Sequence, residues 1–207
     1  MKKLIFISFL FFSFVASGQQ TITKSIVSDA PYIELKTAGI DDLIIRESET
    51  EKLEITILNA DLGILENVSC NDFNCVLSVT TSLKETNKLS TFKAIKVSAI
   101  VKIPRGRKVA VFGETINLKI EGYQGILRVF IDEGNIDIKK IKGITEIVLS
   151  SGNIYAQIVD ASLDIKTRKG SITFDHKIQK SPYKMKKHKK QRLIVKSKKA
   201  NVVLTQL

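Results

Sequence analysis

Residues 125–160 decide the fold of this chain, and their sequence is GILRVFIDE GNIDIKKIK GITEIVLSS GNIYAQIVD. The stretch divides into four units of nine residues, and each unit begins with glycine. The same frame extends back to units that start at Ile116 and Arg107 and forward to Gly170, with Ala161 at the one skipped glycine position. Self-similarity at a short fixed period is typical of solenoid architectures, in which one repeat is one structural unit.

The third and fifth positions of each unit are apolar, except for Thr145. Two residues separated by one other point to the same face of a strand, so each unit predicts a short strand with one buried face. The remaining residues must turn the chain, and glycine suits a corner that needs positive φ or close backbone approach. The paired inward positions are Val109 and Val111, Leu118 and Ile120, Leu127 and Val129, Ile136 and Ile138, Thr145 and Ile147, Ile154 and Ala156, Leu163 and Ile165, and Ile172 and Phe174.

We therefore expect an all-β protein whose second part, residues 107–207, is a single-stranded right-handed parallel β-helix, or β-solenoid. The right-handed winding follows from the crossover rule for parallel strands. At the second position of the units, Asn117, Asn135 and Asn153 alternate with apolar residues, which suggests a two-sided coil of 18 residues carrying an asparagine ladder. A three-sided coil of 27 residues stays open.

The nine-residue frame breaks at Gln179 and resumes at Gln191, where Leu193 and Val195 occupy the buried positions. Residues 179–190 are therefore predicted to be an insertion that projects as a basic loop. Residues 19–106 contain strand-like segments without the regular frame. They predict irregular β coils or an antiparallel cap over the N-terminal end of one elongated domain, because a bare solenoid end is an aggregation edge.

The N-terminal residues have the pattern of a secretory signal peptide. Lys2 and Lys3 precede an apolar run from Leu4 to Val15 and the small residues Ala16-Ser17-Gly18, which predicts cleavage after residue 18. The apolar run is shorter than the roughly 20 residues of a membrane span. We expect an exported protein of the periplasm, cell surface or extracellular space, with no transmembrane segment in the mature chain.

Cys70 and Cys75 are the two cysteines, and four residues separate them. In an oxidising compartment a local disulfide is favoured over two free thiols. No metal site and no cofactor are expected, because no second cysteine pair or nearby histidine completes a ligand set. Calcium-binding β-rolls also have nine-residue repeats, but they need several glycines and an aspartate in each unit, which these units lack.

The segment Val101-Lys102-Ile103-Pro104-Arg105-Gly106, followed by Gly-x-Ile-x-Ile units such as residues 134–138 and 152–154, resembles the bacterial putative adhesin family with the head GIN-type β-helix domain. The resemblance covers residues 100–178 well and the first half in outline. It implies a β-helix and an envelope or surface protein without an assigned reaction.

Positive charge is concentrated near the C-terminus. Between Lys177 and Lys199 the chain has 11 Lys or Arg and no acid. Such a density suits anionic polymers such as acidic polysaccharide or lipopolysaccharide, whereas nucleic acid is not expected outside the cell. The alternative is that lysines protect an exposed last strand from edge pairing. The predicted anion-binding residues are Lys180, Lys184, Lys186, Lys187, Lys189, Lys190 and Arg192.

We weigh a carbohydrate-active β-helix enzyme as the second hypothesis. On an 18-residue coil, the outward carboxylates of Glu146 and Asp164 would stack near each other and could act as acid and base. No nucleophile, base and orienting group can be assembled from His176 and His188, the two histidines of the chain. We therefore expect a non-enzymatic, adhesin-like scaffold.

Overall fold

The computed structural model describes residues 21–27, 29–58, 64–70, 74–81, 96–187 and 190–207. The signal peptide predicted for residues 1–18 lies outside the described residues, and so do His188 and Lys189. Among the described residues, none belongs to a helix with the length and hydropathy that a membrane span requires.

The described residues form strands and connecting segments without a helix, which confirms the all-β class. The strands join in one mixed sheet that is not closed. They are β1 (Thr21–Val27), β2 (Tyr32–Lys36), β3 (Asp42–Glu47), β4 (Lys52–Leu58), β5 (Ile64–Cys70), β6 (Asn74–Thr81), β7 (Ser98–Ile103), β8 (Lys108–Thr115), β9 (Asn117–Glu121), β10 (Ile126–Lys139), β11 (Ile144–Ile158), β12 (Ser162–Thr167), β13 (Ile172–Phe174), β14 (Lys177–Gln179), β15 (Tyr183–Met185) and β16 (Arg192–Gln206).

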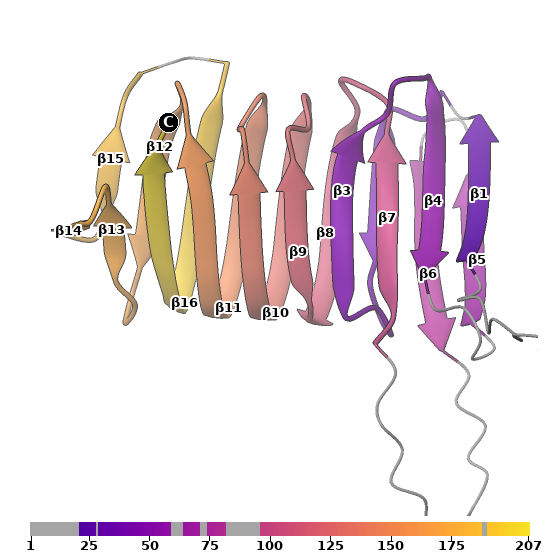
Figure 1. The fold of residues 1–207 in the computed structure, drawn as a ribbon, viewed down its shortest axis with the longest axis horizontal. Coiled ribbons are helices and arrows are strands. Elements are labelled where there is room, and N and C mark those ends of the chain that lie inside the picture. Colours follow the sequence, from indigo (N-terminus) through magenta and orange to yellow (C-terminus); the bar gives the residue numbers. More distant parts are fainter. Residues whose placement is uncertain (1–20, 28, 59–63, 71–73, 82–95, 188–189) are drawn as a thin grey trace, which may run out of the picture.

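The sheet folds into two layers because the long strands bend at a corner (Figure 1). The first part of β10 pairs with β8, whereas its second part pairs with β9. Following these pairings, the first layer has the order β5-β6-β2-β8-β10-β11-β16-β12-β15. The second layer has the order β1-β4-β7-β3-β9-β10-β11-β16-β13-β14.

Successive coils in the middle of the stack are parallel and offset by 18 residues. Ile126 pairs with Ile144 between β10 and β11, and Leu118 pairs with Ile136 between β9 and β10. This register confirms the predicted period of 18 residues and excludes a period of 27 residues. The predicted asparagine ladder is also confirmed: Asn135 Nδ2 donates to Asn117 Oδ1 at 3.1 Å, and Asn153 Nδ2 donates to Asn135 Oδ1 at 2.9 Å.

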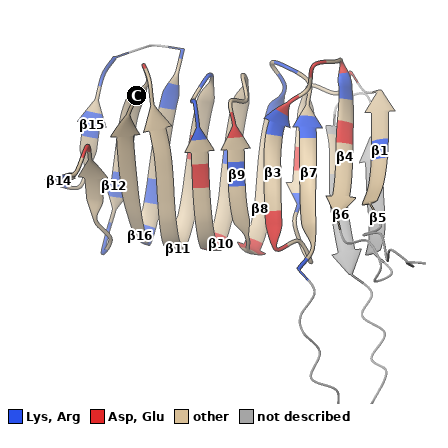
Figure 2. Ribbon diagram, viewed as in Figure 1, with Lys and Arg blue, Asp and Glu red and all other residues tan. Residues whose placement is uncertain are grey.

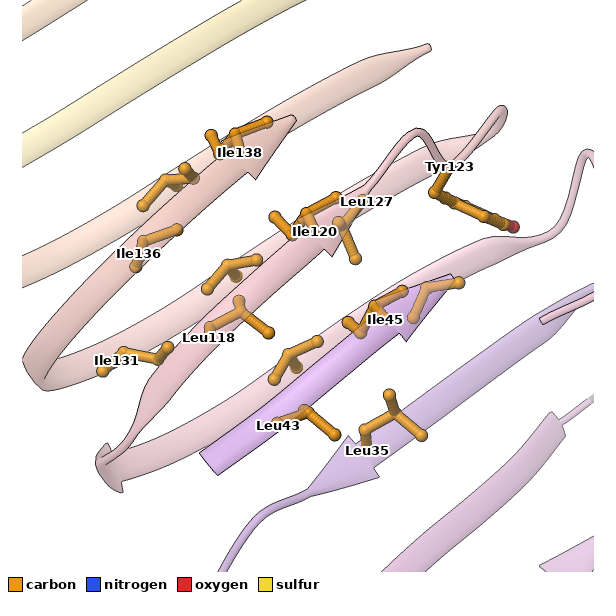
Figure 3. Packing of buried hydrophobic residues seen from close by; sticks show 14 of the residues in the cluster. Leu35, Leu43, Ile45, Leu118, Ile120, Tyr123, Leu127, Ile131, Ile136 and Ile138 are labelled. Atoms are coloured by element: carbon orange, nitrogen blue, oxygen red, sulfur yellow. The ribbon is translucent and has the colours of Figure 1, made fainter. Parts of the chain in front are cut away.

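The core lies between the two layers, and the predicted inward positions contribute many of its side chains, together with others such as Leu35, Leu43 and Ile131 (Figure 3). Ile136 and Ile138 are fully buried, Thr145 is buried among apolar neighbours, and Phe174 is half-buried at the end of the stack. β-Branched side chains suit these positions because they pack well on a pleated surface. Complete burial of each such side chain contributes about 1.5–3 kcal/mol, so the inward positions supply most of the stability.

The last strand does not lie at the end of the stack. β16 pairs in parallel with β11 on one side and with β12 and β13 on the other. A two-residue turn at Asp175 and His176, both with positive φ, first reverses the chain from β13 into β14. The chain then returns to form β16. A turn with positive φ at both central residues matches the twist of a β-hairpin. The prediction that the last strand is exposed is therefore wrong, since both edges of β16 are hydrogen-bonded.

The segment predicted to be a projecting loop is partly built into the sheet. β15 pairs antiparallel with β12, and its Tyr183 and Met185 pack against the core cluster. Three-residue strands form the edges of both layers at this end, β15 in the first and β14 in the second. Very short edge strands that carry lysine limit pairing with other molecules.

The other end of the stack contains antiparallel pairs. β4 pairs antiparallel with β7, and β1 pairs antiparallel with β4. In the β5–β6 hairpin, Cys70 is the register partner of Cys75, and Cys75 is buried and disulfide-bonded. The Cys70 side chain lies outside the described residues, so its pairing with Cys75 stays a prediction.

Candidate anion-binding site

The predicted binding residues lie along β15 and its flanks rather than on one detached loop. Lys184, on β15, faces outward from the first layer with its Nζ 3.7 Å from Asp164 Oδ2. Lys180 precedes Ser181, whose hydroxyl donates to the Thr167 carbonyl oxygen at 2.7 Å, so Lys180 lies at the corner where β12 ends. The described members Lys180, Lys184, Lys186, Lys187, Lys190 and Arg192 are all exposed.

Two lysines outside the predicted set form the centre of the site. Lys166 of β12 and Lys196 of β16 are register partners on adjacent parallel strands, and both are exposed on the outer face of the first layer. Adjacent strands lie about 4.8 Å apart, so the two side chains leave the sheet side by side. Like charges directly opposite each other in a sheet are destabilising. Glu146 Oε1, 3.2 Å from Lys196 Nζ, offsets part of this repulsion, and a bound anion beside Lys166 would offset more of it.

The corner after these strands carries further cations. Arg168 and Lys169 donate their backbone N–H groups to the carbonyl oxygens of Ser197 and Lys198, at 3.2 and 2.9 Å. This pairing holds the corner of β12 against the corner of β16, so that the exposed side chains of Arg168, Lys169, Lys198 and Lys199 gather there. Within the described ranges, no ion pair joins these four side chains to an acid.

Acidic side chains at this end are few and already engaged. Residues 162–207 contain 14 Lys or Arg and the two acids Asp164 and Asp175, a net charge of +12 that equals the net charge of the whole chain. Asp164 pairs with Lys184, and Asp175 Oδ1 accepts from the backbone N–H of Gln206 at 2.8 Å. Figure 2 shows Lys and Arg in blue on β15 and β16, whereas β3 and β4 carry both blue and red residues.

On the second layer, Lys119 and Arg46 share one carboxylate, that of Glu121. Glu121 accepts from Lys119 Nζ at 2.7 Å and from Arg46 Nε. These hydrogen bonds, with that from Lys119 the strongest, lower the pKa of the Glu121 carboxyl, and the same contact raises the pKa of Lys119. We call the first-layer face of β12, β15 and β16, together with their corner at residues 168–169 and 198–199, the basic end.

Protection of a sheet edge does not account for the lysines of β16. Lys196, Lys198 and Lys199 belong to a strand that is paired on both sides, so no open edge lies beside them. Edge protection applies to Lys177 of β14 and Lys184 of β15, the short outer strands. Sequence reasoning missed Lys166, Arg168 and Lys169 because the regular frame placed them in an earlier coil, away from the basic run.

The carboxylates of the enzyme hypothesis are not neighbours. Ile194 of β16 stands between Glu146 and Asp164 as the register partner of both. The two acids are therefore two strand spacings apart, about 9.6 Å. Glu146 is held by Arg128 at 3.5 Å and Lys196 at 3.2 Å, and Asp164 is held by Lys184. The expected stacking of these carboxylates is wrong because β16 inserts between their coils.

No group of three or more His, Cys, Asp or Glu side chains converges on a possible metal position within the part of the chain that the structure describes.

Comparison with known proteins establishes the fold and no more. No protein-family model and no curated protein sequence matches the chain. Among solved structures, the chain is similar to a putative cell adhesion protein from Clostridium sporogenes, with 10% identity, a TM-score of 0.58 and coverage of 92% of this chain and 100% of that one. It is also similar to a putative adhesin from Bacteroides fragilis, with 13% identity, a TM-score of 0.37 and coverage of 91% and 97%.

Proposed function

We propose that this is an exported, non-enzymatic surface protein with an adhesin-like role, whose basic end binds an anionic surface polysaccharide such as acidic capsule or lipopolysaccharide. The observation that carries the proposal is the in-register pair Lys166 and Lys196, next to a corner with four unpaired cations. The strand that bears Lys196 is paired on both sides, so edge protection does not explain its lysines, and within the described residues Glu146 is the acid that contacts Lys196.

The scaffold assigned to this role is a right-handed parallel β-helix with two-sided coils, belonging to the putative adhesin family with the head GIN-type domain. The 18-residue parallel register and the likeness to the Clostridium sporogenes protein support this assignment. A stack of hydrogen-bonded coils is stiff, so it holds the basic end at a fixed distance from the other end of the molecule. The disulfide at Cys75 favours an oxidising compartment outside the cytoplasm.

A polymer suits the basic end better than a small anion. The cations are exposed and spread over three strands and a corner instead of converging inside a cavity. Lysine ammonium groups act as point charges, and each one that neutralises a polymer charge releases a condensed counterion. Binding should therefore be multivalent, tolerant of sequence in the polymer and strongly weakened by salt.

The test is a salt-gradient elution of the mature chain from immobilised heparin, used as a sulfated polysaccharide probe. The Lys166→Gln/Arg168→Gln/Lys196→Gln variant removes three charges from the basic end. A matched variant removes three exposed lysines elsewhere, at Lys52, Lys139 and Lys142. Substitution is preferable to deletion of residues 179–190, because deletion would remove β15 and uncover the core that Tyr183 and Met185 contact.

We expect the basic-end variant to elute at clearly lower salt than the wild type, and the matched variant to elute close to the wild type. Because the two variants have equal net charge, a difference between them reports position and not total charge. Equal elution of both variants would refute a localised site, and absence of salt-sensitive retention in the wild type would refute polyanion binding altogether.

A further inference from the structure

A second surface feature lies on the same outer face of the first layer, in the middle of the stack. A cleft of about 650 Å³ opens where β2, β8 and β10 reach the corner, and Phe112, Phe130, Glu114, Asp132 and Ser150 are among its lining residues. Its volume is within the range of small-ligand sites, roughly 300–1,000 Å³. Nothing in the proposed polyanion binding uses this cleft.

The apolar wall of the cleft is a pair of stacked phenylalanine rings. Phe112 and Phe130 are register partners, and their ring centroids lie 5.1 Å apart with an interplanar angle of 10°. The rings therefore stack along the direction in which the strands succeed one another. Phe130 is half-buried, but Phe112 keeps 40% of its surface exposed. The exposed part of the Phe112 ring, stacked on Phe130, is an aromatic surface that a ligand could cover.

The residues around Phe112 leave 40% of its surface exposed. Lys36 of β2 is the register partner of Phe112, and the chain then turns through Ala38 and Gly39, whose side chains are too small to cover the ring. Thr37 is buried, and both its N–H and its hydroxyl donate to the Phe112 carbonyl oxygen at 3.0 Å. These two bonds fix the corner of β2 to β8, so the open ring face is a rigid part of the surface.

The opposite wall is polar and acidic. Asp132 and Glu114 are exposed at the corner, and Ser150 Oγ donates to Asp132 Oδ1 at 3.4 Å, which leaves the second carboxylate oxygen of Asp132 able to accept. Carboxylates form strong, charge-assisted hydrogen bonds with hydroxyl groups. Lys36, whose Nζ lies 3.6 Å from Glu34 Oε1, adds a donor at the rim.

We propose that this cleft binds a neutral pyranose unit of a glycan. One face of a pyranose presents C–H groups, which are attracted to the negative face of an aromatic ring such as Phe112. The hydroxyls at the edge of the sugar donate to Asp132 and Glu114 and accept from Lys36. The two carboxylates disfavour uronic acids, sulfated sugars and lipid phosphates by repulsion, so the cleft selects a neutral sugar whereas the basic end selects an anionic one.

The cleft and the basic end share one row of the first layer. The register partners along this row are Lys36, Phe112, Phe130, Val148, Lys196 and Lys166. Three strand spacings, about 14 Å, separate Phe112 from Lys196. A heteropolysaccharide lying across the strands could therefore place a neutral residue on Phe112 and an acidic residue on Lys196. The cleft needs only the neutral residue, so it stands independently of the proposed polyanion binding.

The test is saturation-transfer NMR of the mature chain with methyl α-D-mannopyranoside, methyl β-D-glucopyranoside and methyl β-D-galactopyranoside as separate probes. The central variant is Phe112→Leu, which keeps apolar packing but removes the aromatic face, and Asp132→Ala tests the polar wall. The matched control is Tyr155→Ala, because Tyr155 is an aromatic residue with 47% exposure on the second layer. Thermal unfolding by circular dichroism verifies that each variant is folded.

We expect at least one glycoside to receive saturation, with Kd raised at least tenfold by Phe112→Leu and by Asp132→Ala and unchanged by Tyr155→Ala. A wild type that binds none of the three glycosides overturns the proposal. Binding that survives Phe112→Leu in a folded protein also overturns it. Sedimentation with phosphatidylcholine vesicles that depends on Phe112, without glycoside binding, would assign the rings to a lipid surface instead. Glycoside binding in a protein that fails the heparin test would leave this proposal standing and refute only the polyanion site.

Discussion

The corner glycine Gly152 provides the sharpest test of how the coils are stacked. Its φ is +135°, and a Cβ built there would overlap the carbonyl oxygen of Gly134 in the adjacent coil. Substitution by alanine therefore adds two costs: a backbone conformation that is essentially restricted to glycine, and a collision with a backbone atom that cannot move without separating the coils.

The magnitude follows from these terms. A non-glycine residue in such a conformation costs about 1–3 kcal/mol, and overpacking against a well-packed neighbour costs about 1–3 kcal/mol. Alanine also restricts the unfolded chain more than glycine does, which offsets about 0.4–1 kcal/mol of the lost stability. Gly152→Ala should therefore lower the free energy of unfolding by about 1–5 kcal/mol. For a chain of this size each kcal/mol corresponds to roughly 2–4 °C in Tm, so a decrease of about 10 °C lies in the middle of the range.

Gly106 is the matched control. Its φ is +79°, but a Cβ there would meet nothing within 4 Å, so alanine adds backbone strain without a collision. The left-handed conformation costs about 1–2 kcal/mol, of which the unfolded-state effect offsets about half. The assay is urea unfolding followed by circular dichroism, since the chain has no tryptophan. Equal losses for Gly106→Ala and Gly152→Ala would refute the argument that backbone contact between coils sets the cost at Gly152.

Three further outcomes are expected. Leu193→Ala should lower the free energy of unfolding by about 2–5 kcal/mol in the same assay, because Leu193 is fully buried on an interior strand; a loss under 1 kcal/mol would mean that β16 frays at an edge. Asn135→Ala should cost about 1–2 kcal/mol, because it removes two ladder hydrogen bonds, and no measurable loss would make the ladder incidental. Burial, followed by the charge of Glu47, raises the pKa of Tyr123, so its hydroxyl stays protonated in the folded state after it ionises in the unfolded state. The stability that this group contributes is complete below pH 10, its usual pKa, and is lost as the pH rises above that value, with a slope approaching about 1.4 kcal/mol per pH unit. Tyr123→Phe should remove this contribution to the slope of the free energy of unfolding between pH 10 and 12. An unchanged slope in the variant would contradict the expectation.

The repeat pattern was sufficient to predict which side chains face the core. Val129, Ile136 and Leu193 are buried because successive side chains of a strand point to opposite faces. Apolar residues at every second position of the sequence therefore predict the buried face. The alternation of Asn117, Asn135 and Asn153 with apolar residues predicted the 18-residue period. Each of these features depends on residues close together in the chain or one period apart.

The neighbours of each strand could not be predicted from the sequence, because the repeated units share one inward apolar pattern that specifies no partner. β16 pairs with β11 and β12 after the chain has reversed through β14 and β15. That placement separates Glu146 from Asp164 and brings Lys196 beside Lys166, so it removes one candidate site and creates the other. The all-β class, the inward faces and the concentration of charge could all be predicted from the residues alone. Which charges and rings share a surface depends on the tertiary structure, because a repeat encodes the face of a strand but not the identity of its neighbour.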